Sequence, residues 1–206
     1  MVNLFRNVDF VLDDESYFTL SNTTLSGNDN FYSSDRNLTP EDVKHYFMKK
    51  FEKKVLVWAA ASSSGISKLR ISSSGQAITG EVDLKECIQK RLVPFLKEHH
   101  KDDNYMFWPD QAKAHYAKYV LDWMEQNNIK YVPKSVNPAN LPEVRPIEDF
   151  WAYFKREVYK HGWEAKNTEQ IKNHIKYCYG KLDMDFVQNI FSTTKKRLNH
   201  VARNGC

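Results

Sequence analysis

The sequence predicts a single mixed α/β domain, and three observations support this fold class. Short apolar runs with the composition of buried strands fill the first part of the chain. From Val82 onward, segments with helical spacing alternate with short strand-like runs, which indicates a sheet whose later strands run parallel. The 206 residues suffice for one core but leave little for a second, and no repeat or low-complexity linker divides them.

The first predicted strand ends in a group of acids. Val8 to Leu12 is a short apolar-rich run, and Asp13-Asp14-Glu15 follows it directly. Tyr17 to Leu20 is rich in β-forming residues and lies close behind, so we expect it to be the hairpin partner of this strand.

The other elements follow from apolar spacing and from turn-forming residues. Strands are predicted at residues 54–61, 66–71, 105–108 and 129–132. Helices are predicted at residues 82–100 and 112–126, from Pro146 or Ile147 onward, and at 167–179 and 183–201. Polar or proline-rich loops are predicted at residues 21–40, 72–80 and 133–146, with a helix start at Thr39-Pro40-Glu41-Asp42.

Composition excludes some classes of protein and permits others. No apolar run approaches the roughly 20 residues of a membrane-spanning helix, and the first residues lack the organisation of a secretory signal. Three scattered cysteines form no CxxC pair, which favours a reducing compartment over a disulfide framework. The net charge of +4 is mild, but basic residues dominate from Lys155 onward. That segment is either a solvated face or a surface for a polyanion.

Three acids lie where predicted elements end or begin. Asp14 closes the first strand, Asp110 closes the strand at 105–108, and Glu148 lies in the first turn of a helix. Carboxylates at neighbouring strand ends converge at one rim of a sheet, where they could hold two Mg²⁺ or Mn²⁺ ions roughly 4 Å apart. Acids at such places are also ordinary caps and turn formers, so the pattern alone leaves both interpretations open.

Three blocks in the same order resemble transposases of the mariner superfamily. Val11-Leu12-Asp13-Asp14-Glu15 resembles the block of the first aspartate, and Met106-Phe107-Trp108-Pro109-Asp110 resembles the second, with His115 a few positions on. The proline-rich turn that leads to Pro146-Ile147-Glu148, with Trp151 after it, resembles the third. The 37 residues between Asp110 and Glu148 lie within the range that this superfamily uses.

The resemblance implies an RNase H-like fold over residues 1–206, with three antiparallel strands followed by parallel strands, flanking helices, and a C-terminal helical extension at 160–206. It implies DNA cleavage and strand transfer with two Mg²⁺ or Mn²⁺ ions, and Asp14, Asp110 and Glu148 carry over as catalytic metal ligands. It favours Asp14 over Asp13, and Glu148 over Glu143 and Asp149, which fall outside the match. It also implies transposon-end and target DNA as partners and a nuclear location. The resemblance leaves open whether the enzyme forms a homodimer.

The chain departs from the family at two places. The family usually has Asn after the second aspartate, whereas this chain has Gln111. Family members also carry a paired helix-turn-helix region before the catalytic strands, whereas the first predicted strand here begins about eight residues from Met1. We therefore expect a fragment, a decayed copy or a domesticated remnant.

Other residues near the three blocks have two interpretations each. Lys155 and Arg156 follow Glu148 on the same predicted helix and are candidates to contact DNA phosphate, or are simply solvated. His115 either orients a phosphate or a metal-bound water, or is a helix-face histidine with a satisfied hydrogen bond. Trp151 is expected to be a core residue that fixes the helix of Glu148.

Two other functions stay open at this point. One is a non-catalytic DNA-binding or assembly module derived from a transposase, against which the intact set of acids argues. The other is an RNase H-type nuclease acting on RNA–DNA hybrids, which the Pro-Ile-Glu-x-x-Trp segment disfavours.

Overall fold

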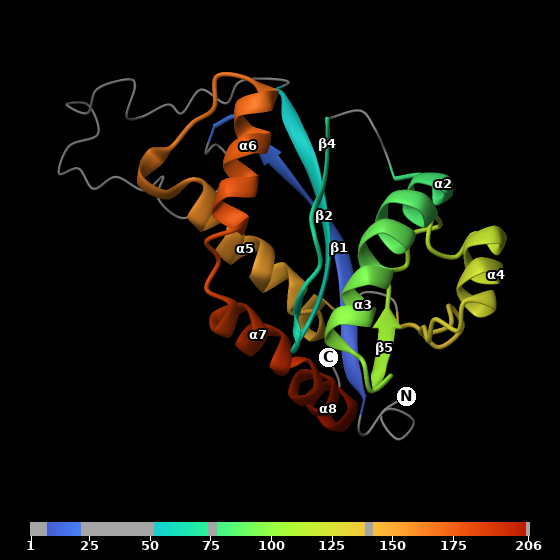
Figure 1. Ribbon diagram of the computed structural model, residues 1–206. Helices are drawn as coiled ribbons and strands as arrows, with labels where there is room; N and C mark the ends of the chain where they lie inside the picture. The colour runs from blue at the N-terminus through green and yellow to red at the C-terminus, as the bar shows by residue number, and fades with distance from the viewer. Residues whose placement is uncertain (1–7, 22–51, 74–77, 139–141, 205–206) are drawn as a thin grey trace, which may run out of the picture.

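The computed structural model describes residues 8–21, 52–73, 78–138 and 142–204, and it shows a mixed sheet with helices on both faces (Figure 1). The strands are β1 (Asp9–Thr19), β2 (Lys54–Ser62), β3 (Gly65–Ile66), β4 (Arg70–Ser73) and β5 (Tyr105–Trp108). The predicted helix start at Thr39-Pro40 and nearly all of the predicted loop at 21–40 lie outside the described residues.

The sheet is antiparallel on one side of β1 and parallel on the other. β1 pairs with β2 in antiparallel fashion, and β2 pairs in the same way with β3 and β4. On its other edge β1 pairs with β5 in parallel, with Leu12 opposite Trp108 at the end of the ladder. The mixed sheet that the sequence predicts, antiparallel strands first and parallel strands after, is confirmed.

β1 is longer than the sequence predicts, and its acids lie inside it. The strand continues through Asp13, Asp14 and Glu15 to Thr19, because the residues from Leu12 to Thr19 pair one by one with β2. The prediction that Asp14 closes the strand was therefore wrong, and Tyr17 to Leu20 is no hairpin partner. β2 satisfies the backbone of the acidic segment, and the β-forming residues after it extend the strand.

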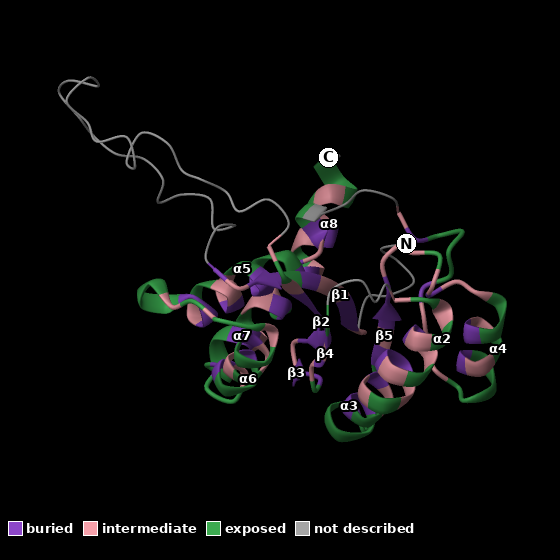
Figure 2. Ribbon diagram, turned by 90° about the horizontal axis from the view of Figure 1, so that it is seen from above, coloured by how far each residue is buried: buried purple, intermediate pink, exposed green. Residues whose placement is uncertain are grey.

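Alternate residues of β1 face two different cores, because successive side chains of a strand point to opposite faces. Phe10, Leu12 and Phe18 belong to the core that α5 (Ile147–Val158), α6 (Thr168–Tyr179) and α7 (Met184–Ser192) cover. Val11 belongs to the opposite core, beneath α3 (Val93–His99) and α4 (Lys118–Gln126). Figure 2 shows these two groups of helices on either side of the sheet. Asp14 lies in register with the first set, and Asp13 and Glu15 with the second.

The remaining helical elements connect these layers. They are α2 (Gly80–Val82), the π-helical segment η2 (Asp83–Leu92), the short turns η3 (Pro142–Val144) and η4 (Lys160–Gly162), and α8 (Thr194–Asn204). α2, η2 and α3 follow one another without a break, so the predicted helix at 82–100 is confirmed as a helical segment with an unusual π-helical middle. In the described part of the chain, no helix combines the length and the apolarity needed to cross a bilayer.

Four further predicted elements differ from the structure. The strand at 66–71 is split into β3 and β4, where Ser67 bonds to the backbone of Ala60 through both its N–H and its Oγ. The strand at 129–132 is a single parallel bridge between Tyr131 and Phe107. The helix at 183–201 is two helices, α7 and α8, which meet at Thr193. The helix at 112–126 begins only at Lys118, because the preceding residues turn inward at the site described next.

Candidate metal centre

Two of the predicted ligands lie side by side because of the register between β1 and β5. The ladder ends with Leu12 opposite Trp108, and two residues further along the chain from each of them are Asp14 and Asp110. β5 stops at Trp108 whereas β1 continues, so the carboxylates stand where the two strands separate. The expectation that acids gather at one rim therefore holds for β5, while Asp14 reaches that rim from the interior of its strand.

A third carboxylate completes a compact group. One oxygen each of Asp14, Glu15 and Asp110 lie within 4.8 Å of one another, and all three residues are partly exposed. Glu15 was not among the ligands that the sequence predicts. Asp14 and Glu15 are neighbours on β1, and their side chains start from opposite faces of the sheet. Asp110, just beyond the end of β5, lies close to both carboxylates.

Glu148 approaches the group from α5 but is not one of its three members. It lies in the first turn of the helix and is exposed, and its charge contributes to the electrostatics of Asp14. One turn further along α5, the indole Nε1 of Trp151 donates a hydrogen bond of 3.0 Å to Oδ2 of Asp14. Trp151 is thus both a core residue and the group that orients the first aspartate.

Burial and mutual repulsion raise the pKa values of the acids on β1. Burial raises the pKa of Asp14 to about 7 against the backbone N–H of Glu15, and the Glu148 carboxylate adds to the rise. Burial raises the pKa of Glu15 to about 8, and the charges of Asp13 and Asp110 add to it. Such carboxylates bind protons near neutral pH when no other positive charge is present.

This donor set fits a divalent metal ion. Oxygen ligands at the rim of a sheet suit Mg²⁺ or Mn²⁺, and a bound cation would favour the ionised forms of these buried acids. Asp14, Glu15 and Asp110 would hold such an ion, and Glu148 stands next to them.

Asp110 differs from the other acids because a histidine and a backbone N–H contact it. Its Oδ1 accepts a 2.7 Å hydrogen bond from the N–H of Ala112 and lies 3.3 Å from Nε2 of His115. Burial would raise the pKa of Asp110, but the hydrogen bond and the charge of His115 outweigh it and lower the pKa. Asp110 is therefore ionised and ready to bind a cation at neutral pH.

His115 is buried among carboxylates, with only 2% of its surface exposed. Its Nδ1 lies 3.0 Å from Oδ2 of Asp83, and its Nε2 lies 3.5 Å from Oδ2 of Asp13. Burial alone would lower the pKa of His115, but Asp13 and the hydrogen bonds to Asp110 and Asp83 raise it well above its usual value. The surrounding carboxylates therefore favour the protonated form of the ring.

Arg145 connects the two strands beyond the end of their ladder. One guanidinium nitrogen donates to the carbonyl of Asp13 at 2.8 Å, and another donates to the carbonyls of Trp108 and Pro109 at 3.2 and 3.3 Å. Its positive charge also lowers the pKa values of Asp13, Asp14 and Asp110 against the larger effect of burial. The sequence places this residue three positions before Glu148, but only the fold shows its contacts.

The chain is similar in sequence to known proteins at low identity. No protein-family model matches the sequence. The chain is 20% identical over 147 residues to the transposable element Tcb2 transposase of Caenorhabditis briggsae, covering 71% of this chain and 50% of that protein. It is 22% identical over 149 residues to the transposable element Tc3 transposase of Caenorhabditis elegans, covering 72% and 43%. The chain spans about half the length of the curated relatives it matches.

Solved structures of the Mos1 transposase have the same fold. A Mos1 paired-end complex with the left transposon end matches with a TM-score of 0.75 at 17% identity, over 99% of this chain and 59% of that one. A mariner Mos1 paired-end complex with Mg matches with a TM-score of 0.74 at 16% identity, over 96% and 56%. The Mos1 catalytic domain matches over 99% of this chain and 88% of its own, with a TM-score of 0.67 at 16% identity.

The chain is similar in sequence to transposases of transposable elements. Its fold is that of the Mos1 mariner catalytic domain, the RNase H-like fold that the resemblance implies.

The departure from the mariner-type second block at Gln111 has a structural role. The side-chain amide of Gln111 donates to the carbonyl of Asn137, outside the group of acids. Asn137 in turn accepts from the indole of Trp108 at 2.8 Å and donates to the carbonyl of Pro109 at 2.9 Å. The longer amide therefore supports the turn that carries Asp110.

The residues proposed to meet DNA occupy different environments. Arg156 is exposed on α5, and Lys155 is half-buried, with its Nζ 5.7 Å from the centre of the Phe18 ring. Burial lowers the pKa of Lys155, and the charges of Glu148 and Asp14 oppose this effect. His115, with both nitrogens occupied inside the protein, is poorly placed for the direct phosphate contact expected of it.

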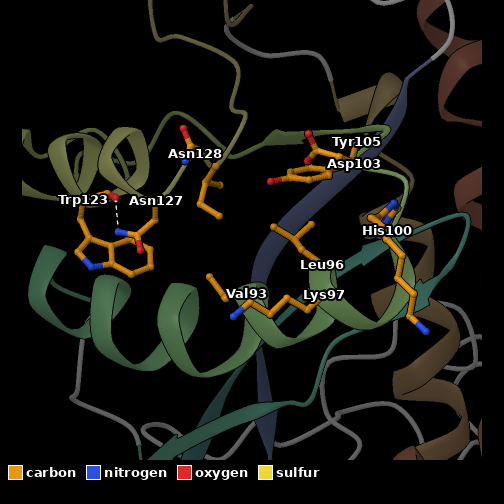
Figure 3. Close-up of a pocket in the computed structure, with 11 residues that line it drawn as sticks. Val93, Leu96, Lys97, His100, Asp103, Tyr105, Trp123, Asn127 and Asn128 are labelled. Carbon is orange, nitrogen blue, oxygen red and sulfur yellow. Dashed lines mark hydrogen bonds between the residues drawn. The ribbon is translucent and has the colours of Figure 1, made fainter.

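A pocket of about 620 Å³ lies apart from the acids of the candidate metal centre. It opens between α3 and α4 near the first residue of β5, and Figure 3 shows Trp123 and Tyr105 at its two ends. None of its lining residues is a predicted metal ligand. The pocket is therefore separate from the chemistry of the site.

Proposed function

We propose that this chain is the catalytic core of a metal-dependent DNA transposase, which cleaves a phosphodiester at a transposon end and transfers the freed strand to target DNA. The observation that carries the proposal is the convergence of Asp14, Glu15 and Asp110 within 4.8 Å, on the fold of the Mos1 catalytic domain. The relatives with similar sequences are named as transposases of transposable elements.

The metal would be Mg²⁺ or Mn²⁺, and we propose two ions. Solved Mos1 complexes contain Mg or Mn. Bound divalent ions would supply charge stabilisation and an activated oxygen nucleophile. Asp14 and Asp110, which lie side by side in the register of β1 and β5, would bind the first ion. Glu148, beside Asp14, would complete the site of the second ion, and Glu15 is a further candidate that the structure adds.

The protein's own residues keep these ligands in position. Trp151 fixes one oxygen of Asp14 by its indole hydrogen bond, and the Ala112 N–H fixes one oxygen of Asp110. Arg145 holds the middle of β1 and the end of β5 at a set separation. Positioning of this kind matters because the alignment of reacting oxygens tolerates little error.

DNA would be the substrate and partner, and the basic C-terminal third would contact its phosphates. Arg156 is exposed on the same helix as Glu148, so a phosphate bound there would lie on the side of the site. Complexes of Mos1 with transposon ends support this choice of partner. A homodimer and a nuclear location belong to the same proposal.

Plasmid nicking in the presence of Mn²⁺ tests the proposal. We expect the parent chain to nick supercoiled DNA, and Asp110→Asn to reduce nicking to the level seen with EDTA while the circular dichroism spectrum stays the same. Asp122→Asn removes the same charge from an exposed position on α4 and serves as the control. If D110N cuts as fast as the parent, the site is wrongly assigned. If the parent shifts DNA without cutting it, a binding module is the better description.

A further inference from the structure

Asp83 is a buried carboxylate that the proposed chemistry does not use. It is the first residue of the π-helical segment η2 and has no exposed surface. Its Oδ2 faces Nδ1 of His115 at 3.0 Å, and its Oδ1 is buried without a hydrogen-bond donor among the described residues. Removal of a carboxylate from water is unfavourable, and a buried ion pair is weak evidence of stability, so another reason for this charge is needed.

The ring that Asp83 contacts leads directly to the candidate metal centre. Nδ1 of His115 faces Asp83, and its Nε2 lies 3.3 Å from Oδ1 of Asp110. The two carboxylates therefore stand on opposite sides of one imidazole. Asp83 at Nδ1, together with Asp13 at 3.5 Å from Nε2, leaves the ring little freedom to rotate and so holds Nε2 next to Asp110.

Asn137 and Arg145 support the turn that carries Asp110, but neither donates a hydrogen bond to its carboxylate. β5 ends two residues earlier, and α4 does not begin until Lys118. Between these elements the chain forms turns, in which the Ala112 N–H is the backbone group that contacts the Asp110 carboxylate. Asp83, by contrast, belongs to a continuous helical segment packed on the sheet. A contact from that segment through His115 therefore fixes a carboxylate that otherwise stands on a turn.

We propose that Asp83 is a positioning residue, which holds the His115 ring so that its Nε2 fixes the Asp110 carboxylate for metal binding. The inference rests on the proposed function and adds to it a contact between the helix and the metal ligand. Outer partners that orient a ligand in this way typically contribute roughly 10–100-fold to metal affinity or activity.

Mn²⁺ binding in the absence of DNA tests this inference, by titration calorimetry on the parent chain and four variants. We expect Asp83→Asn to weaken Mn²⁺ affinity about tenfold, and His115→Gln to weaken it by a similar factor. The double variant should bind no more weakly than His115→Gln alone, because Asp83 acts through that ring. Asp122→Asn, the exposed control, should bind as the parent does.

The outcomes separate positioning from a merely structural role. A structural role would lower the melting temperature of D83N and leave its Mn²⁺ affinity unchanged at temperatures where it is folded, which would overturn the inference alone. Additive losses in the double variant would also overturn it. If D83N does not fold, H115Q decides alone, because Asp83 acts on Asp110 only through that ring: an unchanged Mn²⁺ affinity of H115Q would overturn the inference. Absence of Mn²⁺ binding by the parent would overturn both this inference and the proposed function.

Discussion

The position of Asp14 suits a metal ligand, but its negative charge lowers the stability of the metal-free protein. Its side chain lies against the core of α5, with the Trp151 indole as donor and Glu148 nearby. Burial has raised its pKa to about 7, so above that pH the protein holds a poorly compensated negative charge. Clustered acids that bind metal commonly lower the folding stability of the metal-free protein.

Asp14→Asn should therefore make the metal-free protein more stable. The amide is neutral and can still accept the hydrogen bond of Trp151, so we expect the free energy of unfolding at pH 8 to rise by about 0.5–2 kcal/mol. Urea denaturation in EDTA measures this change. The same variant should lose the stabilisation that Mn²⁺ gives to the parent, and a variant that is less stable than the parent in EDTA would contradict the repulsion argued here.

At the scale of elements, the site depends on how β1 and β5 separate. β5 is short, and beyond the last ladder pair Arg145 connects the two strands by donating hydrogen bonds to carbonyls of both. A guanidinium can reach two strands at once because it carries several donors in a fixed plane, whereas a lysine ammonium acts as a single point of charge.

Replacement of Arg145 should weaken both the fold and the site. Arg145→Met leaves three carbonyls without this donor, and we expect a loss of about 2–3 kcal/mol in the free energy of unfolding. Arg145→Lys should recover only part of this loss. Arg156→Met on the exposed side of α5 is the matched control and should change stability little. Equal stability of R145M and R156M in urea would show that β1 and β5 stay together without the hydrogen bonds of Arg145.

The sequence predicts the existence of three main strands and the place of Asp110 after one of them, because these features depend on local patterns. Apolar runs identify β1, β2 and β5, and Asp110 follows its strand directly. The sequence misses Glu15, Asp83 and Arg145. Asp83 and Arg145 contact partners far along the chain, at His115 and Asp13, and nothing in the pattern of their neighbours marks them.

The late start of α4 has a similar cause. The apolar spacing over 112–126 fits a helix, but His115 turns inward to carboxylates that come from β1 and η2. Tertiary contacts therefore override the local pattern at the position where the site is built.

For the whole molecule, the clustered acids link stability to pH and to metal. The pKa values of Asp13, Asp14 and Glu15 are raised to about 6, 7 and 8 in the folded protein, and that of His115 is also raised. Each of these groups therefore holds its proton more firmly when folded than when unfolded. Wherever the folded state binds more protons, stability falls as pH rises. Between about pH 5.5 and 8, the metal-free protein should accordingly lose stability, a loss that ionisation of the acids causes.

Divalent metal should reverse this dependence, because the cation replaces the protons that leave. Its stabilisation follows RT ln(1 + [L]/Kd), and Kd falls as the ligands ionise. Melting temperatures measured from pH 5.5 to 8 should therefore decline in EDTA, and the difference between Mn²⁺ and EDTA should widen steadily. In Asp14→Asn and Asp110→Asn the widening should be lost. A melting temperature in EDTA that rises over this range would mean that the acids are not packed together in the folded protein, since no such group could then hold its protons to neutral pH.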